Sequence, residues 1–291
     1  MKIIDILNSG KVTVSCELFP PKHGSELTGA KLAVRETAKL GPSFISITCG
    51  AGGGTGDRTI NLVDEAQNVC GITALAHLTC ISAGRDTIRD ALAELASHGI
   101  ENILALRGDM PEGEQASAQP EARQYRHACD LMKEIRDYGG FCIGGACYPE
   151  GHPESATLQQ DIENLKIKVD SGCQFLTTQM FFDNNILYNY MFRLLRNGVD
   201  VPVIAGIMPV TDGRQVSRIC KLSGTALPPR FKAIVEQFSG NPAAMKQAGV
   251  AYATEQIIDL VANGIRHVHI YTMNKPDIAG GIMSNLSEIF R

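Results

Sequence analysis

Eight short apolar segments recur along the chain, and their spacing limits the possible folds more than any other feature of the sequence. Most of them begin 28 to 39 residues after the previous one, which is the length of one strand followed by one helix. The stretches between them have the 3.6-residue periodicity of amphipathic helices. The apolar segments are residues 12–22, 44–54, 74–80, 102–111, 141–153, 174–183, 202–210 and 267–274.

This alternation predicts an α/β fold, a (β/α)8 TIM barrel in which eight parallel strands form the inner ring. Two successive helical segments, 229–238 and 242–264, predict extra helices before the last strand. No linker rich in Pro, Gly or Ser divides the chain, so we expect a single catalytic barrel domain over residues 1–291. A doubly wound open sheet is the alternative that the same pattern allows.

The composition argues against several classes of function. The formal net charge is −4, and the scattered charges form no basic stripe for nucleic acid. No run of about eighteen apolar residues is present that would span a membrane. The N-terminal residues 1–11 are too few and too charged for a signal peptide. We therefore expect a cytoplasmic protein that binds neither nucleic acid nor a membrane.

The chain has nine cysteines, but their spacing predicts neither disulfides nor a metal site. The number is odd and no C-x-x-C pair occurs, so we expect buried, reduced thiols in a reducing cytosol. Cys16 and Cys49 each adjoin a residue that we expect to face the barrel interior. The alternation of side chains along a strand then turns both thiols away from it.

Glu17 is the first candidate catalytic residue, because it ends an apolar strand. Partial desolvation there would raise the pKa of the carboxyl and keep a proton available near neutral pH. The alternative is a structural carboxylate that caps a helix or pairs with Lys22.

Two later strand ends carry groups that suit a cofactor. Arg107 and Asp109 flank one glycine, and a guanidinium there suits a diphosphate or a carboxylate. Tyr148 and His152 lie in a loop between prolines, where a ring can stack and an imidazole can donate to a phosphate. The glycine-rich turn 50–59 matches no nucleotide-binding template, although its amides could hold an anion. Arg107 and Asp109 could equally form a structural salt bridge.

The helical segment 158–172 has a polar stripe opposite its apolar face. Asp161, Asn164 and Lys168 fall three and four residues apart and therefore share one side of the helix. The spacing alone favours an ordinary solvated face.

The last candidates come from the sixth and eighth strands. Alternation places Gln179 on the same side as Thr177 and Phe181. An amide that both donates and accepts suits a heterocycle such as a pterin or a nicotinamide. Tyr271 stands at the corresponding end of the last strand.

Seven of these segments, taken in order, resemble the methylenetetrahydrofolate reductase family over residues 12–274. They are ELFPPK, TCGA, HLTC, LRGD, YPEGHP, TTQMFFD and YTMN. The resemblance implies a flavin-containing eight-stranded barrel that carries FAD. It implies the reduction of 5,10-methylenetetrahydrofolate to 5-methyltetrahydrofolate by hydride transfer in a ping-pong cycle.

The resemblance also implies a role for each matching residue. Glu17 corresponds to the general acid, Asp109 to the carboxylate between flavin and folate, and Gln179 to the amide that binds the folate and then the reducing nucleotide. Ile219 and Tyr271 correspond to further substrate contacts. The positions that hold FAD are Thr48, His77, Arg107, Gly108, Asp109, His127, Tyr148, His152, Asp161, Asn164 and Lys168.

Three departures from the family pattern bear on the cofactor and the electron donor. His127 replaces an aromatic residue, usually tyrosine, that contacts the flavin. Ile167 replaces an arginine of the diphosphate-binding helix, and Ile219 replaces an aromatic residue that packs over the bound substrate in some members. We expect this chain to consist of the barrel without the regulatory domain of longer relatives. We also expect the protein to form a homo-oligomer.

The resemblance leaves the electron donor open. NADH is the expected donor, with NADPH or ferredoxin as alternatives. A flavin-bearing subunit of an electron-transfer complex, fed by ferredoxin or a partner protein, is the rival function. A folate-binding barrel without redox activity is a third, which the retained Glu17 argues against.

Overall fold

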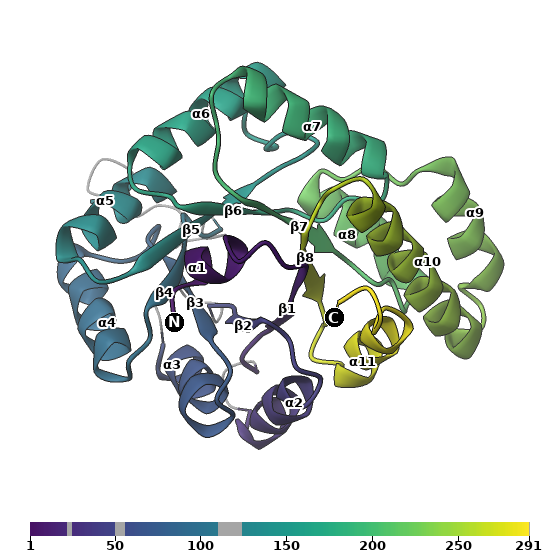
Figure 1. Ribbon diagram of the computed structural model, residues 1–291, viewed down its shortest axis with the longest axis horizontal. Helices are drawn as coiled ribbons and strands as arrows, with labels where there is room; N and C mark the ends of the chain where they lie inside the picture. Colours follow the sequence, from purple (N-terminus) through teal and green to yellow (C-terminus); the bar gives the residue numbers. More distant parts are fainter. Residues whose placement is uncertain (22–24, 50–55, 110–123, 291) are drawn as a thin grey trace, which may run out of the picture.

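The fold is a closed barrel of eight parallel strands in sequential order, as Figure 1 shows. The computed structural model describes residues 1–21, 25–49, 56–109 and 124–290. The predicted barrel is confirmed, and the open-sheet alternative is wrong. The strands are β1 (Thr13–Leu18), β2 (Phe44–Ile47), β3 (Ala74–Thr79), β4 (Asn102–Leu106), β5 (Cys142–Cys147), β6 (Phe175–Thr178), β7 (Val203–Ile207) and β8 (His267–Tyr271).

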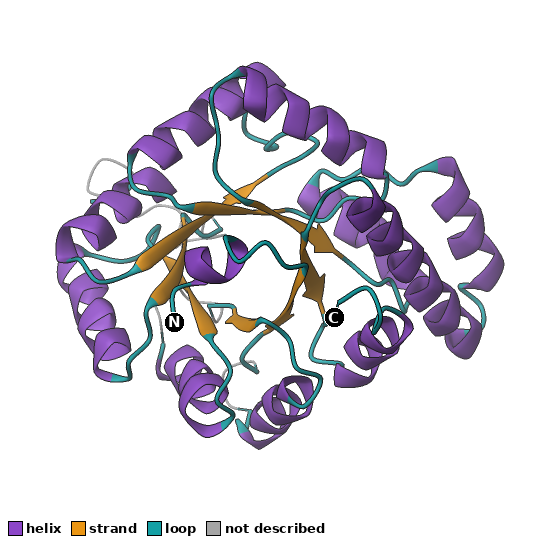
Figure 2. Ribbon diagram, in the orientation of Figure 1, coloured by secondary structure: helices purple, strands orange, loops and turns teal. Residues whose placement is uncertain are grey.

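The helices that surround the strands match the predicted periodic segments (Figure 2). In α4, for example, Ile88, Leu92 and Leu95 are buried on one face, and Gly99 follows the helix with a φ of +70°. The helices are α2 (Thr28–Ala38), α3 (Asp57–Asp64) continued by the π-helical turn η1 (Glu65–Val69), α4 (Arg85–Ser97), α5 (Ala128–Tyr138), α6 (Leu158–Asp170), α7 (Asn184–Arg196), the 3-10 turn η4 (Gly213–Gln215), α8 (Val216–Ser223), α9 (Pro229–Phe238), α10 (Pro242–Ala262) and α11 (Pro276–Asn285).

A short N-terminal helix, α1 (Ile3–Leu7), was not predicted from the sequence. In Figure 2 it lies across the opening of the strand ring. Ile3 and Leu7 pack there against one apolar layer of inward-facing side chains near the starts of the strands. That layer consists of Phe44, Leu75, Leu104, Cys142, Phe175 and Ile204. It closes the amino-terminal end of the barrel.

The extra helices before β8 build a separate apolar cluster beside the ends of β6 and β7. Phe231 of α9 stacks on Tyr252 of α10 at a ring-centroid distance of 4.1 Å and also contacts Phe182. Ile219 of α8 packs against the same cluster and is half-buried. The insertion therefore holds α8 next to the carboxyl end of the barrel.

All nine cysteines are free thiols, and most lie in the apolar interior. Cys16 is fully buried in the layer between strands and helices, as the alternation predicts, and burial raises its pKa to about 12. Cys49 donates to the carbonyl oxygen of His77 at 2.8 Å. Within the described ranges, no three His, Cys, Asp or Glu side chains are arranged to hold a metal ion.

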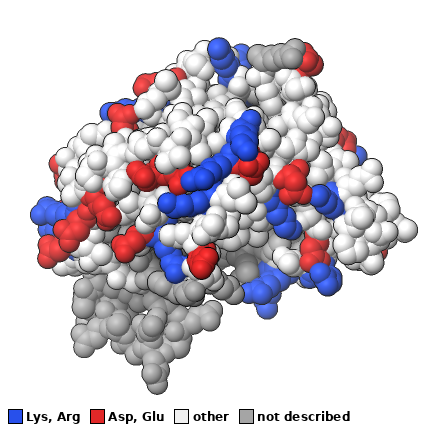
Figure 3. All heavy atoms as spheres, turned by 90° about the horizontal axis from the view of Figure 1, so that it is seen from below, with Lys and Arg blue, Asp and Glu red and all other residues white. Residues whose placement is uncertain are grey.

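The described surface carries both signs of charge side by side. The face in Figure 3 shows Lys and Arg interspersed with Asp and Glu. Among the described residues, no helix is long and apolar enough to cross a membrane.

Candidate active site

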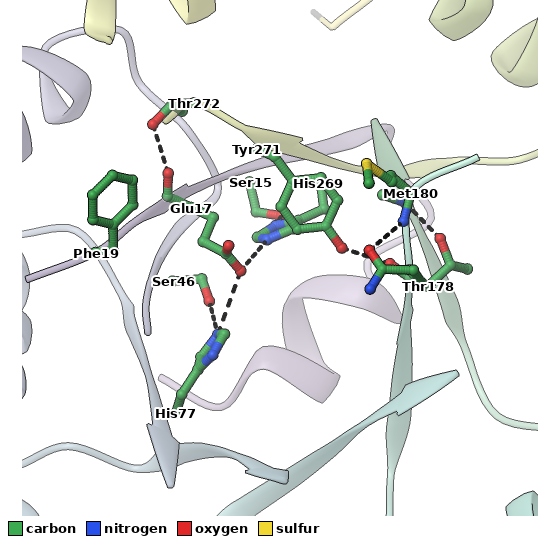
Figure 4. Close-up of polar contacts among 12 residues, drawn as sticks. Ser15, Glu17, Phe19, Ser46, His77, Thr178, Met180, His269, Tyr271 and Thr272 are labelled. Atoms are coloured by element: carbon green, nitrogen blue, oxygen red, sulfur yellow. Dashed lines mark hydrogen bonds and ion pairs between the residues drawn. The ribbon is translucent and has the colours of Figure 1, made fainter. Parts of the chain in front are cut away.

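Glu17 lies at the carboxyl end of β1, between two histidines from other strands (Figure 4). Its Oε2 is 3.4 Å from Nε2 of His269 on β8 and 3.7 Å from Nε2 of His77 on β3. The carboxylate side chain is 19% exposed and both histidine rings are buried. The barrel thus brings one carboxylate and two imidazoles together at its carboxyl end.

A serine hydroxyl contacts each of these imidazoles. Ser46 Oγ lies 2.6 Å from Nε2 of His77, and Ser15 Oγ lies 2.7 Å from Nδ1 of His269. Ser15 precedes Glu17 by two residues and pairs with His269 across the β1–β8 ladder, so both point inward. Ser15, Ser46 and His269 were not predicted from the sequence, although the spacing of His269 and Tyr271 places these two on one face of a strand.

The predicted direction of the pKa shift at Glu17 is wrong. Burial is the largest effect and does raise the pKa, but the hydrogen bond from His269 and the nearby His77 and His269 together lower it below its ordinary value. These partners come from β3 and β8, far away in sequence. Burial lowers the pKa of His77 to about 4 although Glu17 acts the other way, so His77 is neutral at neutral pH.

Tyr271 lies beside this cluster at the end of β8. Its hydroxyl donates to the carbonyl oxygen of Thr178 at 2.6 Å, and its ring packs edge-on against His269 at 5.2 Å. A Cβ on Gly206 of β7 would lie 2.7 Å from the Tyr271 hydroxyl and would collide with the Thr178 carbonyl. Glycine at this position therefore makes room for the tyrosine in the barrel. Burial raises the tyrosine pKa well above its usual range.

Gln179 follows β6 directly and is half-buried. Its backbone N–H donates to the Cys147 carbonyl at 2.7 Å, and its Oε1 accepts from the Met180 N–H at 2.9 Å. The prediction that Phe181 shares a side with Thr177 is wrong. Phe181 packs in the layer between strands and helices, because β6 ends before it and the alternation stops there.

A second group of predicted residues gathers at the ends of β4 and β5. Arg107 pairs with Glu154 through both guanidinium nitrogens, at 2.5 and 2.6 Å. Gly108, with a φ of +88°, turns the chain after it, and Asp109 is exposed. The suggested Arg107–Asp109 salt bridge is replaced by the Arg107–Glu154 pair.

Tyr148 and His152 form one edge of this second group. Their rings make an edge-to-face contact with centroids 4.6 Å apart. Burial is the main cause of the raised pKa of Tyr148 and of the lowered pKa of His152. Asp161 and Arg107 influence the pKa of both side chains, which places all four within electrostatic reach of one another.

The polar stripe on α6 is not an ordinary solvated face. Asp161 is only 6% exposed; its Oδ1 accepts from Ser155 at 3.2 Å, and its buried Oδ2 has no hydrogen-bond partner. Lys168 donates to the carbonyl of Ala146 on β5 at 2.8 Å. Asn164 is exposed. Two of the three stripe residues therefore turn toward the barrel end.

The remaining predicted residues lie around these two groups. Thr48 follows β2, and its backbone N–H donates to the Leu18 carbonyl at 3.0 Å. His127 precedes α5 and is exposed, and its N–H donates to Asp130 at 3.0 Å. Ile167 is 50% exposed on α6. Lys22 and residues 50–55 of the glycine-rich turn lie outside the described residues.

Ionisable and polar groups from β1, β3, β4, β5, β6 and β8 thus meet at the carboxyl ends of parallel strands. Active sites of TIM-barrel enzymes are found at this end. The fold and the site together define a barrel enzyme with a half-buried carboxylate at its centre.

The chain belongs to the methylenetetrahydrofolate reductase family, because the model of the family described as "Methylenetetrahydrofolate reductase" matches residues 2–287. The Arabidopsis thaliana protein named methylenetetrahydrofolate reductase (NADH) 1 is 34% identical over 99% of this chain and 51% of its own length. The 5,10-methylenetetrahydrofolate reductase of Escherichia coli K12 is 32% identical over 95% of this chain and 91% of its own length. The chain thus spans about half the length of the plant relative.

A solved structure supports the fold. A Clostridium thermocellum protein described as binding two copies of 5-methyl-5,6,7,8-tetrahydrofolic acid superposes with a TM-score of 0.65 at 15% identity. The match covers 100% of this chain and 99% of that one. At this identity the likeness establishes the barrel architecture alone.

Proposed function

We propose that the protein reduces 5,10-methylenetetrahydrofolate to 5-methyltetrahydrofolate with FAD as its cofactor. The observation that carries the proposal is the Glu17 carboxyl, held inside the barrel mouth between His77 and His269 in a member of this family. The reaction needs one proton on the bridging nitrogen of the folate before the ring can open. A carboxyl with adjacent imidazoles suits that task.

The residues around β4, β5 and α6 fit FAD. The buried Asp161 Oδ2 lacks a partner and can accept a hydrogen bond from a cofactor hydroxyl. Arg107 and Lys168 supply the positive charge that a diphosphate requires, and Tyr148 offers an aromatic ring beside them. Thr48, Gly108, His127, His152 and Asn164 complete the proposed set. Bound FAD would supply a hydride donor.

The chain's own residues would perform the remaining steps. Glu17 donates its proton to the bridging nitrogen, which opens the five-membered ring to an iminium ion. The amide of Gln179 orients the pterin by donating and accepting hydrogen bonds. Tyr271 and Asp109 flank the folate, and the closed apolar layer beneath excludes water from the barrel.

We propose NADH as the electron donor. Ile219 replaces an aromatic side chain, and loss of one stacking contact costs about 1 kcal/mol, or roughly a fivefold weaker affinity. That is too small to prevent the use of NADH. The plant relatives carry NADH in their names, which agrees with this choice.

The test uses the purified chain. It should be yellow, or become yellow with added FAD, and anaerobic NADH should bleach the flavin within seconds. Methylenetetrahydrofolate should then reoxidise it with formation of methyltetrahydrofolate. A chain that stays colourless with excess FAD refutes the cofactor. If NADH and NADPH do not reduce the flavin but reduced ferredoxin does, the result favours the electron-transfer subunit instead.

A further inference from the structure

His269 is held on both sides of its ring. Nε2 faces Glu17 Oε2 at 3.4 Å, and Nδ1 faces Ser15 Oγ at 2.7 Å. The ring is 2% exposed and packs between Phe44, with centroids 6.4 Å apart, and the edge of Tyr271. Its orientation is fixed by packing as well as by its hydrogen bonds.

A count of hydrogens shows what this arrangement allows. Ser15 has one hydroxyl hydrogen and two acceptors within reach, His269 Nδ1 at 2.7 Å and the Val268 carbonyl at 3.2 Å. If the hydroxyl donates to Nδ1, His269 is neutral and its Nε2–H donates to the Glu17 carboxylate. If the hydroxyl turns to Val268, Nδ1–H donates to Ser15, and one additional proton lies between Nε2 and Glu17. Rotation of one hydroxyl therefore allows the His269–Glu17 pair to take up one proton from solvent.

We propose that His269 is a positioning residue that supplies the proton of Glu17 for folate reduction, with Ser15 as its hydroxyl switch. The inference rests on the proposed function. In the transfer, the Nε2–H bond of the imidazolium breaks and its electron pair stays on nitrogen, while the Oε2–H bond of Glu17 forms. Glu17 then passes this proton to the bridging nitrogen of the folate. Solvent protons restore His269 between turnovers.

The other titratable groups near Glu17 are less suited than His269 to supply this proton. His77 is farther from Glu17, at 3.7 Å, and burial lowers its pKa to about 4, so at neutral pH it lacks the second ring proton that an imidazolium could give. The pKa of Tyr271 lies well above its usual range, and its hydroxyl is committed to the Thr178 carbonyl. Among the described residues, the titratable groups seen to face the ring of His269 are Glu17, His77 and Tyr271.

The same strand offers a matched control. His267 lies two residues earlier on β8, and its Nδ1 is 2.9 Å from Thr13 Oγ1, which repeats the histidine–hydroxyl pair one layer lower in the barrel. Thr13 pairs with His267 in the β1–β8 ladder as Ser15 pairs with His269. A substitution at His267 therefore disturbs the same two strands without touching Glu17.

The experiment compares His269→Gln with His267→Gln in the FAD-loaded protein. A glutamine at 269 can still donate to Glu17 but cannot ionise, so a purely structural role would be preserved. We measure reoxidation of the reduced flavin by methylenetetrahydrofolate in single turnovers across pH. His269→Gln should slow this step roughly ten- to a hundredfold at neutral pH, whereas His267→Gln should match the unmodified protein. The pH profile of this step should change in His269→Gln and stay as in the unmodified protein in His267→Gln.

Flavin binding and flavin reduction by NADH serve as internal controls and should be unchanged in both variants. Ser15→Ala is a second variant, which removes the hydroxyl switch with a smaller loss of volume and should slow the same step alone. If His269→Gln and His267→Gln have the same rate and the same pH profile, the inference is wrong while the proposed function stands. If the unmodified protein does not reduce methylenetetrahydrofolate, both are overturned.

Discussion

Replacing Glu17 by glutamine separates proton donation from every other task of the site. Glutamine has nearly the same volume and can exchange hydrogen bonds with His269 where the carboxylate oxygen now lies 3.4 Å from Nε2. It cannot release a proton. Global stability should therefore change by no more than about 1 kcal/mol, as measured by urea denaturation.

The kinetic effect should fall on one half-reaction. Loss of a general acid costs on the order of a hundred- to ten-thousandfold, which is about 2.7 to 5.4 kcal/mol of activation free energy. We expect that loss in the reoxidation of flavin by methylenetetrahydrofolate, followed by stopped-flow absorbance. Flavin reduction by NADH should stay within about a factor of three, since that step takes no proton from Glu17.

The structure supplies a control and a second readout. Glu36→Gln removes a carboxylate from an exposed pair with Lys39 on α2 and should change neither half-reaction. Removal of the Glu17 charge should lower the pKa of His77 further below about 4, because Glu17 acts to raise it. Equal slowing of both half-reactions, or no slowing of the folate step, would contradict the assignment of Glu17 as the acid.

Three further predictions follow from the contacts of the site. Gly206→Ala should destabilise the fold by about 2 to 4 kcal/mol in urea denaturation, because the added methyl group displaces Tyr271 from the Thr178 carbonyl; a loss below about 1 kcal/mol refutes that close approach. Asp161→Asn should weaken FAD binding about tenfold or more in a fluorescence titration and leave stability unchanged, and an unaltered affinity excludes Asp161 as a cofactor contact. Acidification from pH 6.5 to 4 should lower the free energy of unfolding by about 3 kcal/mol through His77, because the unfolded imidazole has a pKa of about 6.5 and the folded one a pKa of about 4. In His77→Gln, stability should depend less on pH over this range. If the variant loses stability equally steeply, His77 is not the cause.

The barrel was predictable because its strands and helices have different periods and recur at a regular spacing. α10, for instance, begins at Pro242 after the capping residue Asn241 and is followed by Asn263, as the helical segment 242–264 indicated. The helix α1 was missed because a helix of five residues is too short to show a period. Its role in closing the barrel depends on contacts with six strands that no local pattern shows.

The candidate site was predictable in its parts but not in its pairing. The ends of the strands identified Glu17, Arg107 and Tyr148 because polar residues interrupt apolar segments there. The partner of Arg107 is Glu154, from a loop 47 residues later, and nothing in the sequence of either segment specifies that contact. The same limitation produced the wrong direction for the pKa of Glu17, because desolvation is a local effect whereas the opposing histidines come from other strands.

The interior of the barrel changes from apolar to polar within two residues on β2 and β3. On β2 the inward position passes from Phe44 to Ser46, and on β3 it passes from Leu75 to His77. Small side chains at the upper positions leave room for the larger rings from other strands, as Ser15 does for His269. A polar layer of this kind is stable only if each group has a partner, and the hydroxyl–imidazole pairs supply one for each histidine. We therefore expect serine beside histidine to allow a carboxyl to be held in the barrel without a fixed countercharge, which would keep Glu17 able to exchange its proton.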